Sequence, residues 1–69
     1  MTTYRAQYGE RVAEIRPVRA TPFGWSDEDT FYRIELDGDD LPGLHVYVDD
    51  AQRAAEERVG HALTWEVSK

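Results

Sequence analysis

Apolar residues recur at every second position in four stretches of the chain, namely residues 4–8, 30–36, 44–48 and 63–67. This period of two is typical of β-strands that bury one face. Glycine, proline and aspartate are frequent between the stretches, as expected for turns. The pattern therefore predicts four strands, each of which turns one row of side chains towards a core.

Residues 12–20 form a further predicted strand, in which the alternation changes phase. The apolar residues are Val12, Ala13 and Ile15 before Pro17, and Val18 and Ala20 after it, so the buried row moves from odd to even positions. Pro17 lies at the change, and proline cannot donate a hydrogen bond to a neighbouring strand. A β-bulge would shift the alternation in this way. We therefore expect one long, bent strand with a bulge near Arg16 and Pro17.

The third and fourth regular stretches are separated by a helical segment. Residues 51–58 are rich in strong helix formers. Asp49 and Asp50 come directly before them and carry oxygens that can cap the free amides of a first helical turn. Gly60 follows, and glycine readily adopts the left-handed conformation that ends helices. We expect a short helix whose alanine-rich face docks on the sheet, because propensity alone would not hold it in water.

Residues 37–43 contain aspartates, glycines and a proline, and they predict a turn between two strands of a hairpin. Placing Leu36 opposite Leu44 aligns the apolar rows of the two strands. This register gives two further pairs on the other face, Glu35 with His45 and Arg33 with Tyr47.

Together, these elements predict a single small β-rich domain over residues 1–69. Five short strands and one helix favour a five-stranded antiparallel barrel or a strongly curved sheet, and closure would remove exposed edges. The order strand-strand-strand-strand-helix-strand resembles that of Src-homology-three-like barrels, in which a short helical turn precedes the last strand. It differs from the oligonucleotide-binding fold, whose helix usually follows the third strand. No motif assigns functional residues by this resemblance.

Composition narrows the function classes. The chain has no cysteine, which excludes disulfides, thiolate metal sites and a cysteine nucleophile. No apolar run approaches the roughly 20 residues that cross a bilayer, and the first eight residues lack the apolar segment of a signal peptide. We expect a cytoplasmic protein that does not enter a membrane.

Residues with catalytic or metal-binding potential are few. Glu35 and His45 could share acid-base chemistry or form part of a metal site, but we favour a charge pair across two strands on a solvated face. An EF-hand loop counted from Asp37 would place Pro42 at its glycine and Val48 at its glutamate, so the calcium motif fails. No phosphate-binding glycine loop is present. We therefore expect no enzyme, no cofactor and no bound metal.

The aromatic residues are more informative. Phe23 and Trp25 flank Gly24 in an otherwise polar loop, where they form either a lid on the core or anchors for a partner. A second candidate strip lies on the odd-numbered face of the predicted hairpin. It consists of Phe31, Arg33, His45 and Tyr47. Exposed aromatic patches of this kind mark partner sites.

We therefore predict a non-enzymatic protein-binding module that acts through these aromatic side chains, with homodimerisation as a variant. The net charge of −6 and the small size are typical of accessory or inhibitor proteins, for example from phage or mobile elements. The alternative is a nucleic-acid-binding barrel, since residues 1–20 have a net charge of +2. In that case Arg5, Arg11, Arg16 and Arg19 would contact phosphates. The overall acidity opposes this alternative.

Overall fold

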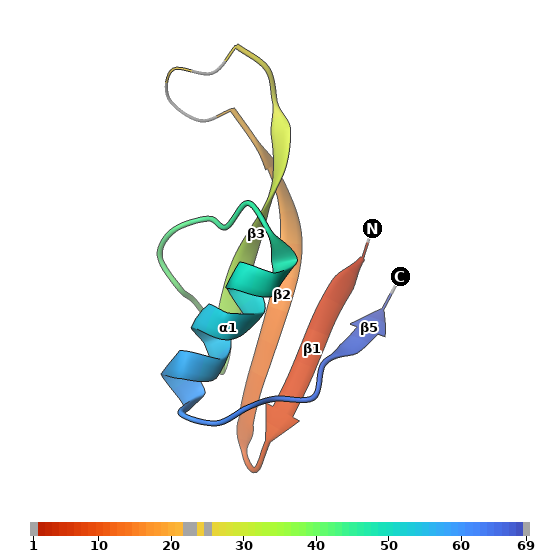
Figure 1. The fold of residues 1–69 in the computed structure, drawn as a ribbon, viewed down its shortest axis with the longest axis vertical. Coiled ribbons are helices and arrows are strands. Elements are labelled where there is room, and N and C mark those ends of the chain that lie inside the picture. The colour runs from red at the N-terminus through yellow and green to blue at the C-terminus, as the bar shows by residue number, and fades with distance from the viewer. Residues whose placement is uncertain (1, 22–23, 25, 69) are drawn as a thin grey trace.

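A computed structural model describes residues 2–21, 24 and 26–68, and it shows an antiparallel sheet with a helix on one face (Figure 1). The five strands lie in the order β4-β3-β2-β1-β5. Along the chain, the elements are β1 (Thr3–Tyr8), β2 (Arg11–Ala20), β3 (Asp29–Leu36), β4 (Asp39–Asp40), α1 (Val48–Val59) and β5 (Glu66–Ser68).

The mainly-β class with one short helix before the last strand is as predicted. The sheet is open, with β4 at one edge and β5 at the other. Neither closure into a barrel nor the likeness to Src-homology-three-like barrels is therefore confirmed. Within the described part of the chain, no helix combines the length and the apolar character that crossing a membrane requires.

The core lies between α1 and the strands β2 and β3. Ala51 and Ala55 of the helix are fully buried and belong to one cluster with Ile15 of β2 and Ile34 of β3. Because alanine has no side chain beyond Cβ, the helix backbone can approach the sheet closely. This contact stabilises a helix that would be marginal by itself in water. We call the side of the sheet that α1 covers the helix face, and the opposite side the outer face.

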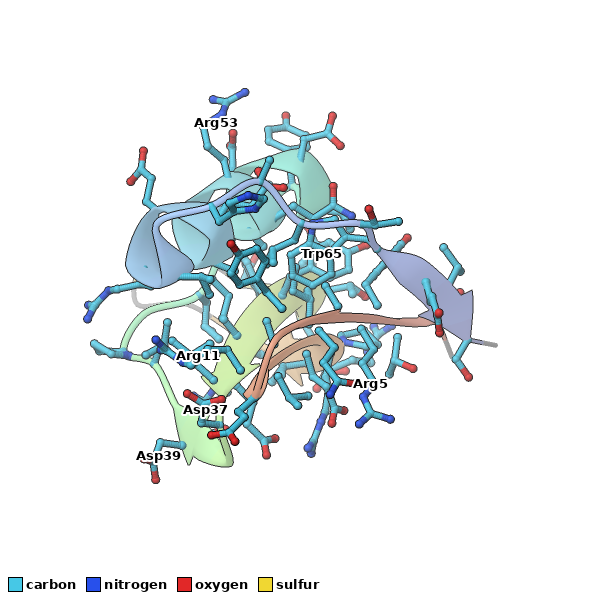
Figure 2. The ribbon with its side chains drawn as sticks, turned by 90° about the horizontal axis from the view of Figure 1, so that it is seen from below. Arg5, Arg11, Asp37, Asp39, Arg53 and Trp65 are labelled. Atoms are coloured by element: carbon cyan, nitrogen blue, oxygen red, sulfur yellow. The ribbon has the colours of Figure 1, made fainter. Side chains whose placement is uncertain are left out.

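Trp65 extends the core after the helix has ended. Its side chain is half-buried against the core cluster, and Figure 2 shows it between the helix and the strands. The indole Nε1 is buried and has no hydrogen-bond partner among the described residues. An unsatisfied buried donor costs about 1–3 kcal/mol, and burial of the large ring offsets this cost.

The predicted bulge in the second strand is wrong. The pairing of β2 with β3 runs without interruption from Ala13 opposite Leu36 to Ala20 opposite Asp29. The apolar positions change phase because the strand buries different faces along its length. Ala13 and Ile15 face the helix, whereas Val18 lies on the outer face, opposite the buried Phe31.

The predicted strand over residues 44–48 and its register are also wrong. The strand that follows β3 is the two-residue β4, which pairs Asp39 with Leu36 and Asp40 with Glu35. Asp37 and Gly38 form the turn, with φ angles of 52° and 88°. Two positive φ angles are the requirement of a type I′ hairpin turn, for which Asp-Gly is a preferred sequence. Glu35 therefore does not face His45, and Arg33 does not face Tyr47.

The helix begins earlier than predicted. Tyr47 is its N-cap and makes no side-chain cap hydrogen bond, so capping by Asp49 and Asp50 is wrong. These two carboxylates lie in the first turn, where negative charge interacts favourably with the positive end of the helix dipole and stabilises the helix. The predicted stop at Gly60 is confirmed, with a φ of 82° and an N–H that donates to the Glu56 carbonyl at 2.8 Å.

The long strands β2 and β3 extend beyond the helix, and the molecule measures 42 × 23 × 20 Å along its principal axes (Figure 1). The helix begins beside the middle of this hairpin and runs away from the loop that joins β2 to β3 (Figure 1). Part of the helix face is therefore left without a covering element, and this part includes the surface described next.

Candidate protein-binding surface

A shallow hollow lies on the helix face, on the part of the sheet that α1 leaves uncovered. Its volume is about 360 Å³. We call it the tyrosine hollow. Its lining residues are Thr2, Tyr4, Pro17, Arg19, Thr30 and Tyr32. Two aromatic rings and one proline therefore contribute apolar surface to it.

Strand register explains why these side chains meet. Tyr4 is paired with Ile15 and therefore lies on the helix face, because directly paired residues point to the same side of a sheet. Pro17 is directly opposite Tyr32, one alternation further along β2 and β3. Tyr4 and Tyr32 are both half-buried at the margin of the core cluster. The rings are thus held by packing below while their upper parts stay accessible.

An ion pair stands at the end of the hollow nearest the tip of the β2–β3 hairpin. The Nε of Arg19 lies 2.5 Å from a carboxylate oxygen of Glu28, and both side chains are more than half exposed. Asp29 accepts a hydrogen bond from the Thr30 N–H at 2.7 Å. Glu28 therefore balances the charge of Arg19. Its sequence neighbours Asp27 and Asp29 add two further negative charges, with Asp29 on the outer face.

An exposed apolar segment leads from β4 to the start of α1. Leu44, Val46 and Tyr47 are 38%, 53% and 68% exposed. His45 connects this segment to the sheet, because its N–H and C=O form hydrogen bonds of 2.9 and 2.7 Å with the backbone of Tyr32. The exposed segment, residues 44–47, is therefore attached directly beside the tyrosine hollow.

The residues of the predicted aromatic strip do not lie together. Phe31 is on the outer face and only 5% exposed, and Arg33 is on the same face with its guanidinium 3.5 Å from Asp40. His45 is at the edge of β3, and Tyr47 is at the helix start. Phe23 and Trp25, the other two predicted partner-binding residues, lie outside the described residues.

The four arginines proposed for phosphate binding divide between the two faces. Arg11 and Arg19 lie on the helix face, and Arg5 and Arg16 on the outer face. Three of them have acidic partners. These pairs are Arg11 with Asp37 at 2.5 Å, Arg16 with Glu35 and, at 3.7 Å, with Glu14, and Arg19 with Glu28. Phosphates would have to compete with these carboxylates.

The acid-base hypothesis has no geometric support. Glu35 binds Arg16 on the outer face and is paired along the strand with Asp40. His45 meets Tyr32 through the backbone instead. Among residues 2–21, 24 and 26–68, no three acidic or histidine side chains converge as a metal site would require.

The sequence did not predict the hollow. One feature of the sequence could have indicated it, namely that the second and third predicted strands are longer than the part of the sheet that one short helix can cover. A strand of 10 residues is longer than the part that one helix covers when it crosses the sheet obliquely. Apolar side chains at the uncovered end of such a strand are candidates for a surface site.

The two faces of the sheet differ in their chemistry. On the outer face, the exposed side chains of Arg16 and Arg33 are occupied by ion pairs with Glu35 and Asp40. The helix face offers aromatic and aliphatic surface. Comparison of the chain with known protein families, with curated proteins and with solved structures found no match.

Proposed function

We propose that the protein is a non-enzymatic binding module that recognises another protein. The observation that carries this proposal is the exposed apolar segment, residues 44–47, which the backbone of His45 attaches to Tyr32 of the tyrosine hollow. We call the two together the docking surface. An accessory or inhibitor role fits this function, because such proteins act by occupying a surface of their target.

Burial supplies the driving force. Val46 and Tyr47 are both more than half exposed, and each square ångström of apolar surface removed from water contributes about 25 cal/mol. Tyrosine is also enriched among residues that dominate binding energy, since its ring is large and rigid and its hydroxyl can still form a hydrogen bond. Tyr47 is therefore the residue that we expect to contribute most.

The partner is a different protein rather than a second copy. Each chain has a net charge of −6, so two copies repel each other. A homodimer would need enough apolar contact to overcome this repulsion. Sedimentation of the protein at several salt concentrations tests this point, and a dimer that persists at low salt would contradict it.

Site-specific photo-cross-linking tests the proposal. A photoreactive phenylalanine analogue replaces Tyr47 in one variant and Arg53 in the control variant, and each is exposed to a lysate of the native host. Arg53 is a suitable control because its side chain is 73% exposed and points away from the sheet (Figure 2).

We expect a discrete protein adduct from position 47 and not from position 53. Equal patterns from the two positions, or no protein adduct from either, would contradict a docking surface at the helix start. Recovery of nucleic acid that is lost on addition of salt would support the alternative based on Arg5, Arg11, Arg16 and Arg19.

A further inference from the structure

We propose that the tyrosine hollow receives an arginine or lysine side chain from a basic segment of the partner protein. This inference rests on the proposed protein-binding function and assigns the chemistry of the partner. Three features of the hollow support it, namely its aromatic lining, its size and the charge at its end.

The aromatic lining suits a cation. A guanidinium or ammonium group is attracted to the face of a tyrosine ring, with about 0.5–1 kcal/mol at exposed sites and more where water is excluded. Tyr4 and Tyr32 line the hollow, and Pro17 lies between their strands and adds an aliphatic surface. Such a surface covers the methylene groups of a long basic side chain while its head remains near water.

The size suits one side chain. At about 360 Å³ the hollow is open to solvent, and it is near the lower limit of pockets that hold small molecules, roughly 300–1,000 Å³. Such a shallow site would bury too little of a free ligand. It can bury one side chain whose backbone rests on the neighbouring exposed segment.

The charge at the end of the hollow selects the sign of the ligand. Asp27, Glu28 and Asp29 follow one another in the chain near this end, and Glu28 forms an ion pair with Arg19 of the hollow. These four residues together carry a formal charge of −2. Arg19 forms its ion pair with Glu28 at an exposed position, and exposed ion pairs contribute little to stability. A basic side chain from a partner can therefore replace Arg19 as the group that meets Glu28.

The same charges disfavour other occupants. Phosphate groups of a nucleic acid would meet these carboxylates, and repulsion between like charges opposes such contact. A second copy of the chain would bring a net charge of −6 with it. A basic protein segment is the occupant that complements both the aromatic floor and the acidic end.

A fluorescently labelled hexa-arginine peptide with blocked ends serves as the probe, and anisotropy measures its dissociation constant in about 0.1 M salt. Three variants are compared with the wild type after circular dichroism has confirmed folding: Glu28→Gln, Arg19→Gln and Glu57→Gln. Glu57→Gln is the matched control, since it removes the same charge from an exposed position towards the far end of α1.

We expect Glu28→Gln to weaken peptide binding roughly threefold or more, and Glu57→Gln to change it by less than about 1.5-fold. Arg19→Gln should tighten binding by about threefold, because it removes the cation that competes for Glu28. Equal weakening by the two glutamine variants of Glu28 and Glu57 would show only general attraction to an acidic protein. That result, or the absence of any binding, would overturn the proposal.

Amide chemical shifts measured with the same peptide locate the site. Changes centred on Thr30 and Tyr32 support the hollow, whereas changes centred on α1 contradict it. If position 47 gives a protein adduct but Glu28→Gln and Glu57→Gln weaken peptide binding equally, the protein-binding function stands and the basic ligand is rejected. If position 47 gives no adduct but Glu28→Gln weakens peptide binding more than Glu57→Gln does, the docking surface is rejected and a cation site is retained.

Discussion

Asp37 connects the turn after β3 to the first residues of β2 through Arg11. Its carboxylate accepts a hydrogen bond from the Arg11 Nε at 2.5 Å and from the Val12 N–H at 2.8 Å. The Asp37 N–H in turn donates to the Val12 carbonyl at 2.8 Å. Figure 2 shows Arg11 and Asp37 side by side. Two hairpin turns at the same end of the sheet are thus fixed to each other by one carboxylate.

This arrangement makes the stability of the fold dependent on acid. The pKa of Asp37 is lowered from its usual 3.8, chiefly by the hydrogen bond from Val12 and then by Arg11, while partial desolvation acts in the opposite direction. Because the pKa is lower in the folded state, the stabilisation is complete above the unfolded value and is lost as the pH falls through the folded value.

We therefore predict that Asp37→Asn lowers the melting temperature at pH 7, and that its difference from the wild type shrinks as the pH falls below about 4. Asparagine is the appropriate replacement because it tolerates the φ of 52° at this position. Thermal melts of both proteins across this pH range measure the effect. Asp39→Asn removes the same charge and serves as the control, and an equal loss in that variant would refute a specific role for Asp37.

Gly60 provides a second test of the fold. Its φ of 82° is unfavourable for any residue with a Cβ, and a Cβ built there would have no atom within 4 Å. The cost of Gly60→Ala should therefore be conformational strain alone, about 1–2 kcal/mol. Urea denaturation measures it. Gly60→Asn should cost less, since asparagine enters the left-handed region more easily, and an equal loss in the two variants would contradict this explanation.

The sequence allowed the position of the helix stop and of the first three strands to be predicted, because glycine placement and apolar alternation are local signals. It did not give the register after β3, since the turn-forming residues continue to Gly43 and several turns compete within them. The two-residue Asp-Gly turn is the one that the twist of the strands favours. Choosing it would have placed Asp40 opposite Glu35 in advance.

The change of phase at Pro17 shows a different limit. A bulge and a change in the buried face give the same sequence pattern, and only the packing partner distinguishes them. The partner of Ile15 is the helix, whereas Val18 lies opposite Phe31 on the outer face. For the same reason the hollow could not be predicted, because it depends on where α1 lies across the sheet.

The close approach of helix and sheet predicts a specific sensitivity at Ala55. This residue is fully buried, and the neighbouring Ala54 is only half-buried. Ala55→Val adds two methyl groups where the helix meets the strands, and overpacking of this kind costs about 1–3 kcal/mol. Ala54→Val introduces the same β-branched side chain into the same helix. Chemical denaturation of both variants should show a clearly larger loss at position 55, and similar losses would mean that helix propensity alone is responsible.

Tyr47 connects stability with function. As the N-cap of α1 it makes no side-chain cap hydrogen bond, and its ring is 68% exposed. Serine is a favoured N-cap because its oxygen accepts a hydrogen bond from the free amides of the first turn, and a good cap contributes about 1 kcal/mol. Tyr47→Ser should therefore raise the free energy of unfolding by roughly that amount.

The same substitution should weaken partner binding, because it removes the largest exposed apolar side chain of the docking surface. Tyr47→Phe is the matched control, since it keeps the ring and also lacks a capping oxygen suited to the first turn. We expect Tyr47→Phe to preserve both stability and the affinity for the partner isolated by cross-linking. Tyr47→Ser could prove more stable and yet bind the partner as tightly as the wild type. That result would show that the unfavourable N-cap is kept for a reason other than binding. A variant that gains stability while its dissociation constant rises about tenfold would show that recognition, at a cost in helix stability, accounts for the tyrosine.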